Sequence, residues 1–126
     1  MAQTELFDKV RSPKLAGYVA WGPFLTGDSQ STAQISAGLV PDPRVRHFWD
    51  QRRSVAMGLT NVLGTAPLVA WDIYLVYGPG VVWSRKDLTP PKPTVFMNLK
   101  KGSPTAVYFT GPALRQRVEQ ELKKAP

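Results

Sequence analysis

The 126-residue chain contains no cysteine and only one histidine, His47. Without a thiol it forms no disulfide and performs no reaction that needs a thiolate nucleophile. A single histidine excludes a multi-histidine metal site, and any catalytic triad would have to use it. Long apolar runs are also missing, since no stretch approaches the ~18 to 20 residues that span a bilayer. Thiol redox chemistry, polyhistidine metal sites and membrane spanning are therefore not expected.

Acidic residues are scarce. The chain has 9 Asp and Glu against 16 Lys and Arg, which gives a formal net charge of +7. This balance favours an anionic partner, such as a nucleic acid, a membrane surface or a phosphorylated metabolite. The basic residues are nevertheless scattered in pairs, with no long run and no nucleic-acid motif. We expect ordinary solvated faces, with an anion-binding patch as the alternative.

The remaining composition is that of a globular protein, with 43% hydrophobic and 20% charged residues. We expect one domain over residues 1–126, in which residues 1–17 form a polar lead-in that holds a short helix. The first residues lack the basic and apolar sections of a signal peptide, so we expect a cytoplasmic protein unless an export segment has been removed. No cofactor is expected, and the oligomeric state is not predicted.

The first half of the chain predicts an alternation of strands and helices. The apolar residues 18–25 are typical of a strand. The turn residues 26–29 follow, and Asp28 or Ser29 is expected to cap a helix that continues to about Val40 by accepting a hydrogen bond from a first-turn amide. This predicts a strand–turn–helix unit.

A second such unit follows directly. Residues 44–49 predict a strand, and Asp50 is the next candidate helix cap. Apolar residues recur at helical spacing over residues 51–63, and Gly64 stands where a left-handed residue would end the helix. The order strand, helix, strand, helix is thus expected by this point.

The second half is dominated by predicted strands. Residues 68–77 are apolar on both faces, which indicates a strand in the middle of a sheet. Residues 81–83 are expected to pair back on it as a hairpin, and residues 94–99 and 106–109 are further strand candidates. Residues 113–124 have apolar positions at helical spacing and predict an amphipathic helix.

The resulting fold prediction is an α/β domain. A three-layer sandwich would place helices on both faces of one mixed sheet of four to six strands. Two features of the chain resemble the thioredoxin-like superfamily. Residues 26–29 stand where that family carries its C-x-x-C redox motif, and Pro67 precedes a strand where the family has a cis-proline. Pro93 is the alternative for that proline.

The chain is therefore similar to the thioredoxin-like superfamily over most of residues 18–124, and residues 42–50 and 70–74 look like those of bacterial members. The departure from the family decides the chemistry. Thr26 and Ser29 would occupy the two cysteine positions, and their hydroxyls neither ionise readily nor form a disulfide. Oxidoreductase, isomerase and thiol-peroxidase activities are therefore excluded for this chain alone. The start of the helix would still present amides that suit an anion.

Two side chains need a separate interpretation. His47 shares a strand face with Val45 and Trp49, so we expect a packed structural histidine, with general acid–base work as the alternative. Asp72 interrupts the most apolar strand, and a buried carboxylate needs hydrogen bonds or a cation. An arginine partner would make Asp72 structural, and the alternative is a site residue.

The tryptophans, Trp21, Trp49, Trp71 and Trp83, are expected in or near the core, unless one lies open beside the turn as a binding surface.

We therefore keep three hypotheses of function. The first is a redox-inactive module that binds a protein or peptide in a groove between the 26–29 turn and the Pro67 loop. Its binding candidates are Trp21, Thr26, Gly27, Asp28, Ser29 and Pro67. The second is a small-molecule enzyme or anion-binding protein that uses the helix start with Arg44, Arg46 or Arg53, and with Asp72 as the carboxylate. The third, nucleic-acid binding, rests on charge only. No catalytic residue is assigned.

Overall fold

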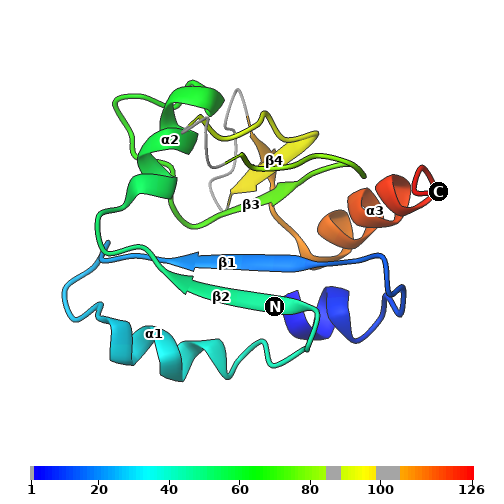
Figure 1. The fold of residues 1–126 in the computed structure, drawn as a ribbon, viewed down its shortest axis with the longest axis horizontal. Coiled ribbons are helices and arrows are strands. Elements are labelled where there is room, and N and C mark those ends of the chain that lie inside the picture. The colour runs from blue at the N-terminus through cyan, green and yellow to red at the C-terminus, as the bar shows by residue number, and fades with distance from the viewer. Residues whose placement is uncertain (1, 85–88, 99–105) are drawn as a thin grey trace. The chain divides into compact units, whose positions relative to one another are not determined.

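The computed structural model describes residues 2–84, 89–98 and 106–126. The chain divides into two compact units, Met1–Val55 and Ala56–Pro126, and each is described by itself. A single domain over the whole chain stays a prediction. Along the chain (Figure 1) the elements are η1 (Gln3–Phe7), β1 (Gly17–Trp21), α1 (Gln30–Ala37), β2 (Val45–Trp49), α2 (Ser54–Leu63), β3 (Ile73–Val76), β4 (Val95–Asn98), β5 (Val107–Tyr108) and α3 (Gly111–Leu122).

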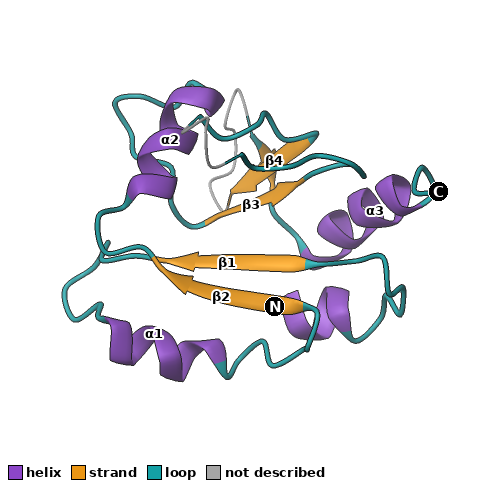
Figure 2. Ribbon diagram, in the orientation of Figure 1, coloured by secondary structure: helices purple, strands orange, loops and turns teal. Residues whose placement is uncertain are grey.

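The first unit is built on a parallel pair of strands. β1 and β2 run in the same direction (Figure 2), with a register from Gly17 opposite Val45 to Trp21 opposite Trp49. Parallel neighbours need a crossover connection, and α1 supplies it. The first predicted strand proves shorter, because it ends at Trp21. The helix also ends at Ala37 instead of residue 40.

The polar lead-in contains the expected short helix, the single π-helical turn η1. Leu6, Phe7 and Val10 are buried, so this segment adds to the core of the first unit. Phe7 lies so close to Gly17 that a Cβ on that glycine would sit 2.7 Å from the ring atom Cζ. The first strand therefore begins with the one residue that leaves room for the ring.

The β1–β2 pair has two different faces, as the period of a strand requires. Val45 is buried, and His47 and Trp49 are half-buried on one face, as expected. The residues that alternate with these along the two strands lie on the opposite face and are exposed. They are Tyr18, Ala20, Arg46 and Phe48. We call these four residues the outer face of the pair.

α2 begins three residues later than the sequence predicts. The carboxylate of Asp50 accepts hydrogen bonds from the amides of Ser54 at 2.9 Å and Val55 at 2.8 Å, so Asp50 does serve the start of this helix. The intervening Arg53 has φ 55°, which is left-handed and not helical. At the other end, Gly64 has φ 67°, which confirms it as the left-handed residue after the helix.

The second unit contains a three-stranded sheet. β4 pairs antiparallel with β3 and parallel with β5. The prediction of a hairpin between β3 and residues 81–83 is wrong, because β4 pairs with β3 and residues 81–83 are not a strand. The predicted strands 94–99 and 106–109 are confirmed as β4 and β5 over their central residues. Residue 99 lies outside the described residues.

The most apolar predicted strand, 68–77, is reduced to the four residues of β3. Asp72 has φ 54°, and a left-handed residue cannot continue an extended strand. Residues before it therefore form a loop, and Asp72 is exposed at the strand entrance, not buried within the sheet. Trp71 and Trp83 are also exposed, by 45% and 44%, which corrects the prediction of core positions for these two tryptophans.

The last helix closes the core of the second unit. The hydroxyl of Thr110 accepts a hydrogen bond from the amide of Ala113 at 3.1 Å, and Pro112 lies in the first turn. Leu114 and Val118 are buried, as their spacing predicts. Met97 in β4 is fully buried at the centre of this unit.

The protein is thus a mixed α/β structure with two small sheets and, among the described residues, four helices. One mixed sheet of four to six strands stays a prediction. Within the described part of the chain, no helix combines the length and apolar character needed to cross a membrane.

Candidate functional site

The end of β1 is held by a hydrogen-bond chain through His47. The indole Nε1 of Trp21 donates to Nδ1 of His47 at 3.1 Å, and Nε2 of His47 lies 3.0 Å from the carbonyl oxygen of Val40. An indole nitrogen only donates, so Nδ1 accepts and the network assigns the proton to Nε2. Both ring nitrogens are therefore engaged. This geometry agrees with a structural histidine and leaves no nitrogen for a metal or for base catalysis.

The turn after β1 is closed by its own side chains. One carboxylate oxygen of Asp28 accepts hydrogen bonds from the amides of Phe24 at 2.9 Å and Leu25 at 2.6 Å. Asp28 therefore closes the loop and does not cap the helix. Thr26 and Gly27, which lie between Leu25 and Asp28 in the sequence, are exposed. Gly27 has φ 92°, a left-handed conformation that favours glycine.

Ser29 is the residue that caps α1. Its hydroxyl accepts from the amide of Thr32 at 3.1 Å, and the hydroxyl of Thr32 accepts from the amide of Ser29 at 2.9 Å. This reciprocal capping box satisfies a first-turn amide without any ligand. An anion at this helix start would also approach the carboxylate of Asp28. The turn is thus better suited to hold its own backbone than to bind an anion.

Arg44 is fully engaged in a structural contact. Its Nε and Nη2 donate to the two carboxylate oxygens of Asp42, each at 2.8 Å. The remaining donors reach the carbonyl oxygens of Val10 at 2.6 Å, Ser12 at 3.1 Å and Phe7 at 2.7 Å. Five N–H groups make five hydrogen bonds. Arg44 therefore joins β2 to the N-terminal segment and has no donor left for a ligand. We call this arrangement the Arg44 clamp.

The Arg44 clamp also changes the pKa of its carboxyl group, that of Asp42. Hydrogen bonds from the Arg44 side chain and backbone lower the pKa of Asp42 to about 2. The pKa of Arg44 is raised by the same side-chain pair. Both groups stay charged over the whole neutral range.

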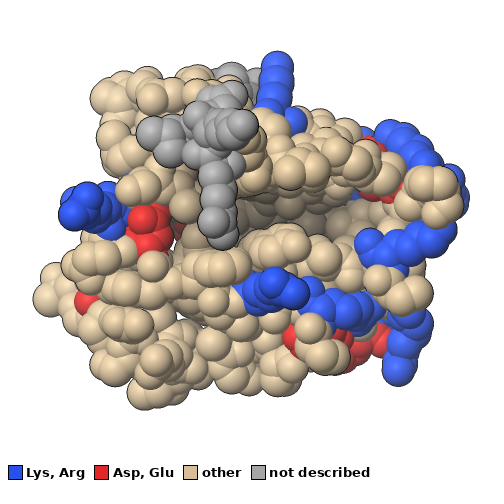
Figure 3. All heavy atoms as spheres, viewed as in Figure 1, with Lys and Arg blue, Asp and Glu red and all other residues tan. Residues whose placement is uncertain are grey.

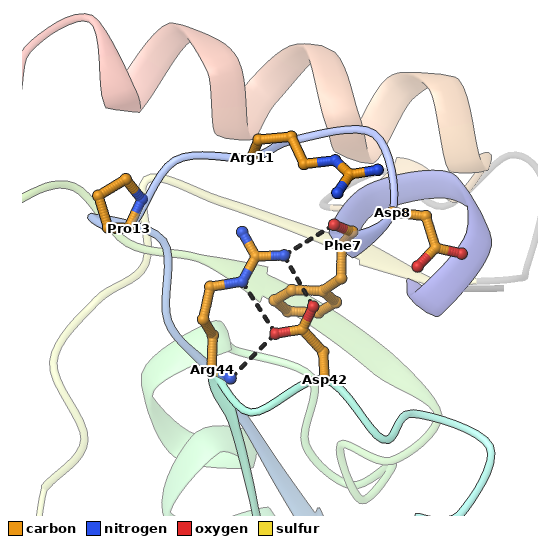
Figure 4. Close-up of a pocket in the computed structure, with 6 residues that line it drawn as sticks. All are labelled: Phe7, Asp8, Arg11, Pro13, Asp42 and Arg44. Atoms are coloured by element: carbon orange, nitrogen blue, oxygen red, sulfur yellow. Dashed lines mark hydrogen bonds and ion pairs between the residues drawn. The ribbon is translucent and has the colours of Figure 1, made fainter.

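An open cavity of about 490 Å³ lies beside the clamp (Figure 4). Arg44 and Asp42 are committed to each other, and Asp8 accepts a hydrogen bond from the side chain of Gln3 at 2.6 Å. Charge of both signs lines the cavity, so it favours no simple anion or cation. The lining residues are Phe7, Asp8, Arg11, Pro13, Asp42 and Arg44.

The other two arginine candidates lie in different surroundings. The guanidinium carbon of Arg53 lies 6.0 Å from the ring centre of Phe24, beside the turn. Arg46 is on the outer face of β1–β2, opposite Tyr18. The structure therefore does not gather Arg44, Arg46 and Arg53 around one ligand position.

The remaining candidates, Pro67 and Asp72, belong to the second unit. The Ala66–Pro67 peptide bond is cis. Among the described residues it is the one cis bond, and the peptide bond before Pro93 is not cis. Pro67 and Asp72 are both exposed. The groove predicted between the Pro67 loop and the 26–29 turn stays a prediction, because the two segments lie in different units.

The loop that contains Pro67 is fixed by hydrogen bonds from buried and local groups. The hydroxyl of Thr60, in α2, accepts from the amide of Ala70 at 2.9 Å and donates to the carbonyl of Ala56 at 2.7 Å. Thr60 and Ala70 are 5% and 6% exposed. The Thr65 hydroxyl donates to the carbonyl of Leu68 at 2.9 Å. We call residues 65–71 the pinned loop.

The pinned loop displays two large apolar side chains to solvent. Leu68 is 68% exposed and Trp71 is 45% exposed. The sequence places both inside a predicted central strand, so their exposure could not be read from the apolar pattern. Thr60 is the residue that could have indicated this loop. It is polar but lies among the buried apolar residues of α2, and a buried hydroxyl needs a hydrogen-bond partner, which is here the amide of Ala70.

No family model, no curated protein and no solved structure matches the chain. The function must therefore be argued from the residues themselves. Among those described, no group of three or more acidic or histidine side chains is arranged to hold a metal ion.

Proposed function

We propose that this protein is a redox-inactive, thioredoxin-like domain that binds a protein or peptide. The proposed domain has one mixed sheet of four to six strands with helices on both faces, in which the four exposed residues of the outer face of β1–β2 are a part of the sheet left uncovered. The order of elements supports it. A strand–helix–strand unit, β1–α1–β2, is followed by α2, by the antiparallel strands β3 and β4, by the short strand β5 and by the final helix α3. The absence of cysteine removes thiol exchange, the usual activity of that superfamily.

The observation that carries the binding role is the pinned loop with exposed Leu68 and Trp71. Single exposed apolar residues are common and need no explanation. Here two of them lie on a loop that one buried hydrogen bond, from the amide of Ala70 to Thr60, and one exposed hydrogen bond, from Thr65 to the carbonyl of Leu68, hold in place. A loop already ordered loses less conformational entropy on binding, and tryptophan is among the residues that contribute most at interfaces.

The competing anion-binding role has weaker support. Arg44 has no donor left, Ser29 and Thr32 satisfy each other, and Asp28 adds a negative charge to the turn. Nucleic-acid binding still rests on net charge. Figure 3 shows Asp or Glu beside Lys or Arg at several places on one face, and Lys9–Glu5 and Lys124–Glu121 are ion pairs at 2.9 and 2.7 Å.

Selection from a random peptide library displayed on phage tests the proposal with the full chain as bait. Selected peptides are resynthesised, and their affinities are measured by fluorescence anisotropy. We expect Leu68→Ser and Trp71→Ser each to weaken binding about tenfold or more, as substitution of a central interface residue does.

Ile35→Ser is the matched control, because Ile35 is 78% exposed on α1 in the first unit. It should leave affinity unchanged. Circular dichroism and thermal unfolding establish that each variant is folded. The proposal fails if no peptide is selected, or if the selected peptides bind the loop variants as tightly as the unmodified chain.

A further inference from the structure

We propose that the outer face of β1–β2 is a second interaction surface, which binds an acidic segment of a partner protein that also carries an apolar side chain. This inference is independent of the proposed function, because it concerns the first unit and none of the residues of the pinned loop. It begins from an exposed aromatic pair. Tyr18 is 69% exposed and Phe48 is 53% exposed.

The two rings form one ordered surface. Their centres are 6.3 Å apart and their planes differ by 19°. Phe48 stands opposite Ala20, whose small side chain leaves the phenyl ring uncovered on that side. Both aromatic residues lie on paired strands, so their backbone positions are set before any partner arrives. Parallel strands are usually covered on both faces, which makes this uncovered aromatic surface unusual.

Arg46 supplies the charge that selects the partner. It lies opposite Tyr18 on the same face and is exposed. Within the described part of the chain its side chain makes no hydrogen bond or ion pair, in contrast to the side chain of Arg44 two residues earlier. An arginine next to two aromatic rings can bind a carboxylate through two N–H groups while the rings cover an apolar side chain.

The charge balance argues against two other occupants. A second copy of the chain would bring Arg46 toward Arg46 in a symmetric contact, between molecules that each carry a net charge of +7. A single-stranded nucleic acid brings a phosphate with every base. The outer face offers one cation among three uncharged side chains, so it matches an acidic segment that also carries an apolar side chain better than a polyanion with a phosphate at every position.

The test uses two short capped peptides with two leucines each, one with flanking aspartates and one with lysines in their place. Each is titrated into the ¹⁵N-labelled full chain, and amide shifts and anisotropy give the contacted residues and the affinity. We expect saturable binding of the aspartate peptide, with shifts concentrated at Tyr18, Arg46 and Phe48.

Substitutions then separate charge from apolar contact. Arg46→Glu should weaken the aspartate peptide about tenfold and create binding of the lysine peptide. Phe48→Ala should weaken the aspartate peptide without reversing the charge preference. Leu39→Ala changes another exposed apolar residue and is the control. It should leave the affinity for both peptides unchanged.

Three results would overturn the inference. The first is the lack of saturable binding by the aspartate peptide. The second is equal affinity for Arg46→Glu and the unmodified chain. The third is tighter binding of an oligothymidylate or oligouridylate at these same residues, which would assign the face to nucleic acid. Loss of binding in the pinned-loop variants leaves this inference untouched, so the two proposals fail separately.

Discussion

Arg44 and Asp42 form a two-point ion pair in which Nε and Nη2 of the arginine each lie 2.8 Å from a different carboxylate oxygen. The same guanidinium holds three carbonyls of the N-terminal segment. A residue that charge alone suggested for ligand binding thus connects two parts of the first unit. Because one partner of this pair is a carboxylate, the stability of the fold should depend on pH.

The stability of the protein should decrease in acid through Asp42. Its pKa is about 2 in the folded chain, lowered from 3.8 by Arg44. A carboxyl with a lowered pKa contributes stability above its unfolded pKa and loses that contribution as pH falls through the folded pKa. We expect this loss between about pH 4 and about pH 2.

Urea unfolding of the unmodified chain and of Asp42→Asn over this range measures the contribution. The variant should be less stable at pH 5, and the difference should narrow steadily toward pH 2. A difference that does not change with pH would contradict the assignment.

Gly17→Ala should destabilise the first unit by about 1 to 3 kcal/mol, as overpacking of a close contact does. The new methyl group would lie 2.7 Å from Cζ of Phe7 and 3.1 Å from Cγ2 of Val45. Thermal unfolding gives the change. In the double variant with Phe7→Leu, the smaller side chain makes room, so the combined loss should be less than the sum of the two single losses. Simple additivity would show that the ring does not cause the effect.

Thr60→Val should destabilise the protein by about 1 to 3 kcal/mol, because it leaves the buried amide of Ala70 without an acceptor. It should also weaken peptide binding by the pinned loop, although Thr60 itself is buried. Thr60→Ser keeps the hydroxyl and serves as the control for both effects. Chemical unfolding and anisotropy measure them. Wild-type peptide affinity in Thr60→Val would mean that the loop needs no anchoring.

Tyr77 should make the second unit sensitive to base. Burial raises the pKa of Tyr77 to about 12, against a smaller lowering by a hydrogen bond with Trp83. Its hydroxyl also donates to the carbonyl of Pro91 at 3.1 Å. A group with a raised pKa stabilises the fold fully below its unfolded pKa, and this contribution declines as pH rises from about 10 to about 12.

Comparing Tyr77→Phe with the unmodified chain isolates the contribution of Tyr77 to the loss of stability in base. Burial also raises the pKa of Tyr74, but Tyr74 is present in both proteins, so its contribution cancels. Unfolding in urea at pH 9, 10 and 11 should show that the unmodified chain loses more stability than the variant. Parallel losses would assign the base sensitivity to other groups.

The amino-acid sequence alone excludes thiol chemistry and predicts the helices and several of the strands. Hydrophobic periodicity predicts α1, α2 and α3 within a few residues. The sequence also predicts Gly64 as the residue after α2, and it narrows the cap of α1 to Asp28 or Ser29, of which the structure uses Ser29. These features depend on neighbours a few residues away, so a linear pattern contains them. The sequence also predicts the polar lead-in with its short helix, which the structure has as η1.

Which groups are available to a ligand depends on the tertiary fold and could not be predicted from local sequence patterns. The apolar run 68–77 could not reveal that Asp72 turns left-handed and leaves Leu68 and Trp71 in solvent. Nor could net charge distinguish Arg44, with every donor engaged, from exposed Arg46. Strand pairing, burial and hydrogen-bond partners depend on residues far apart in the chain, such as Val10 and Arg44, and a local pattern does not specify them.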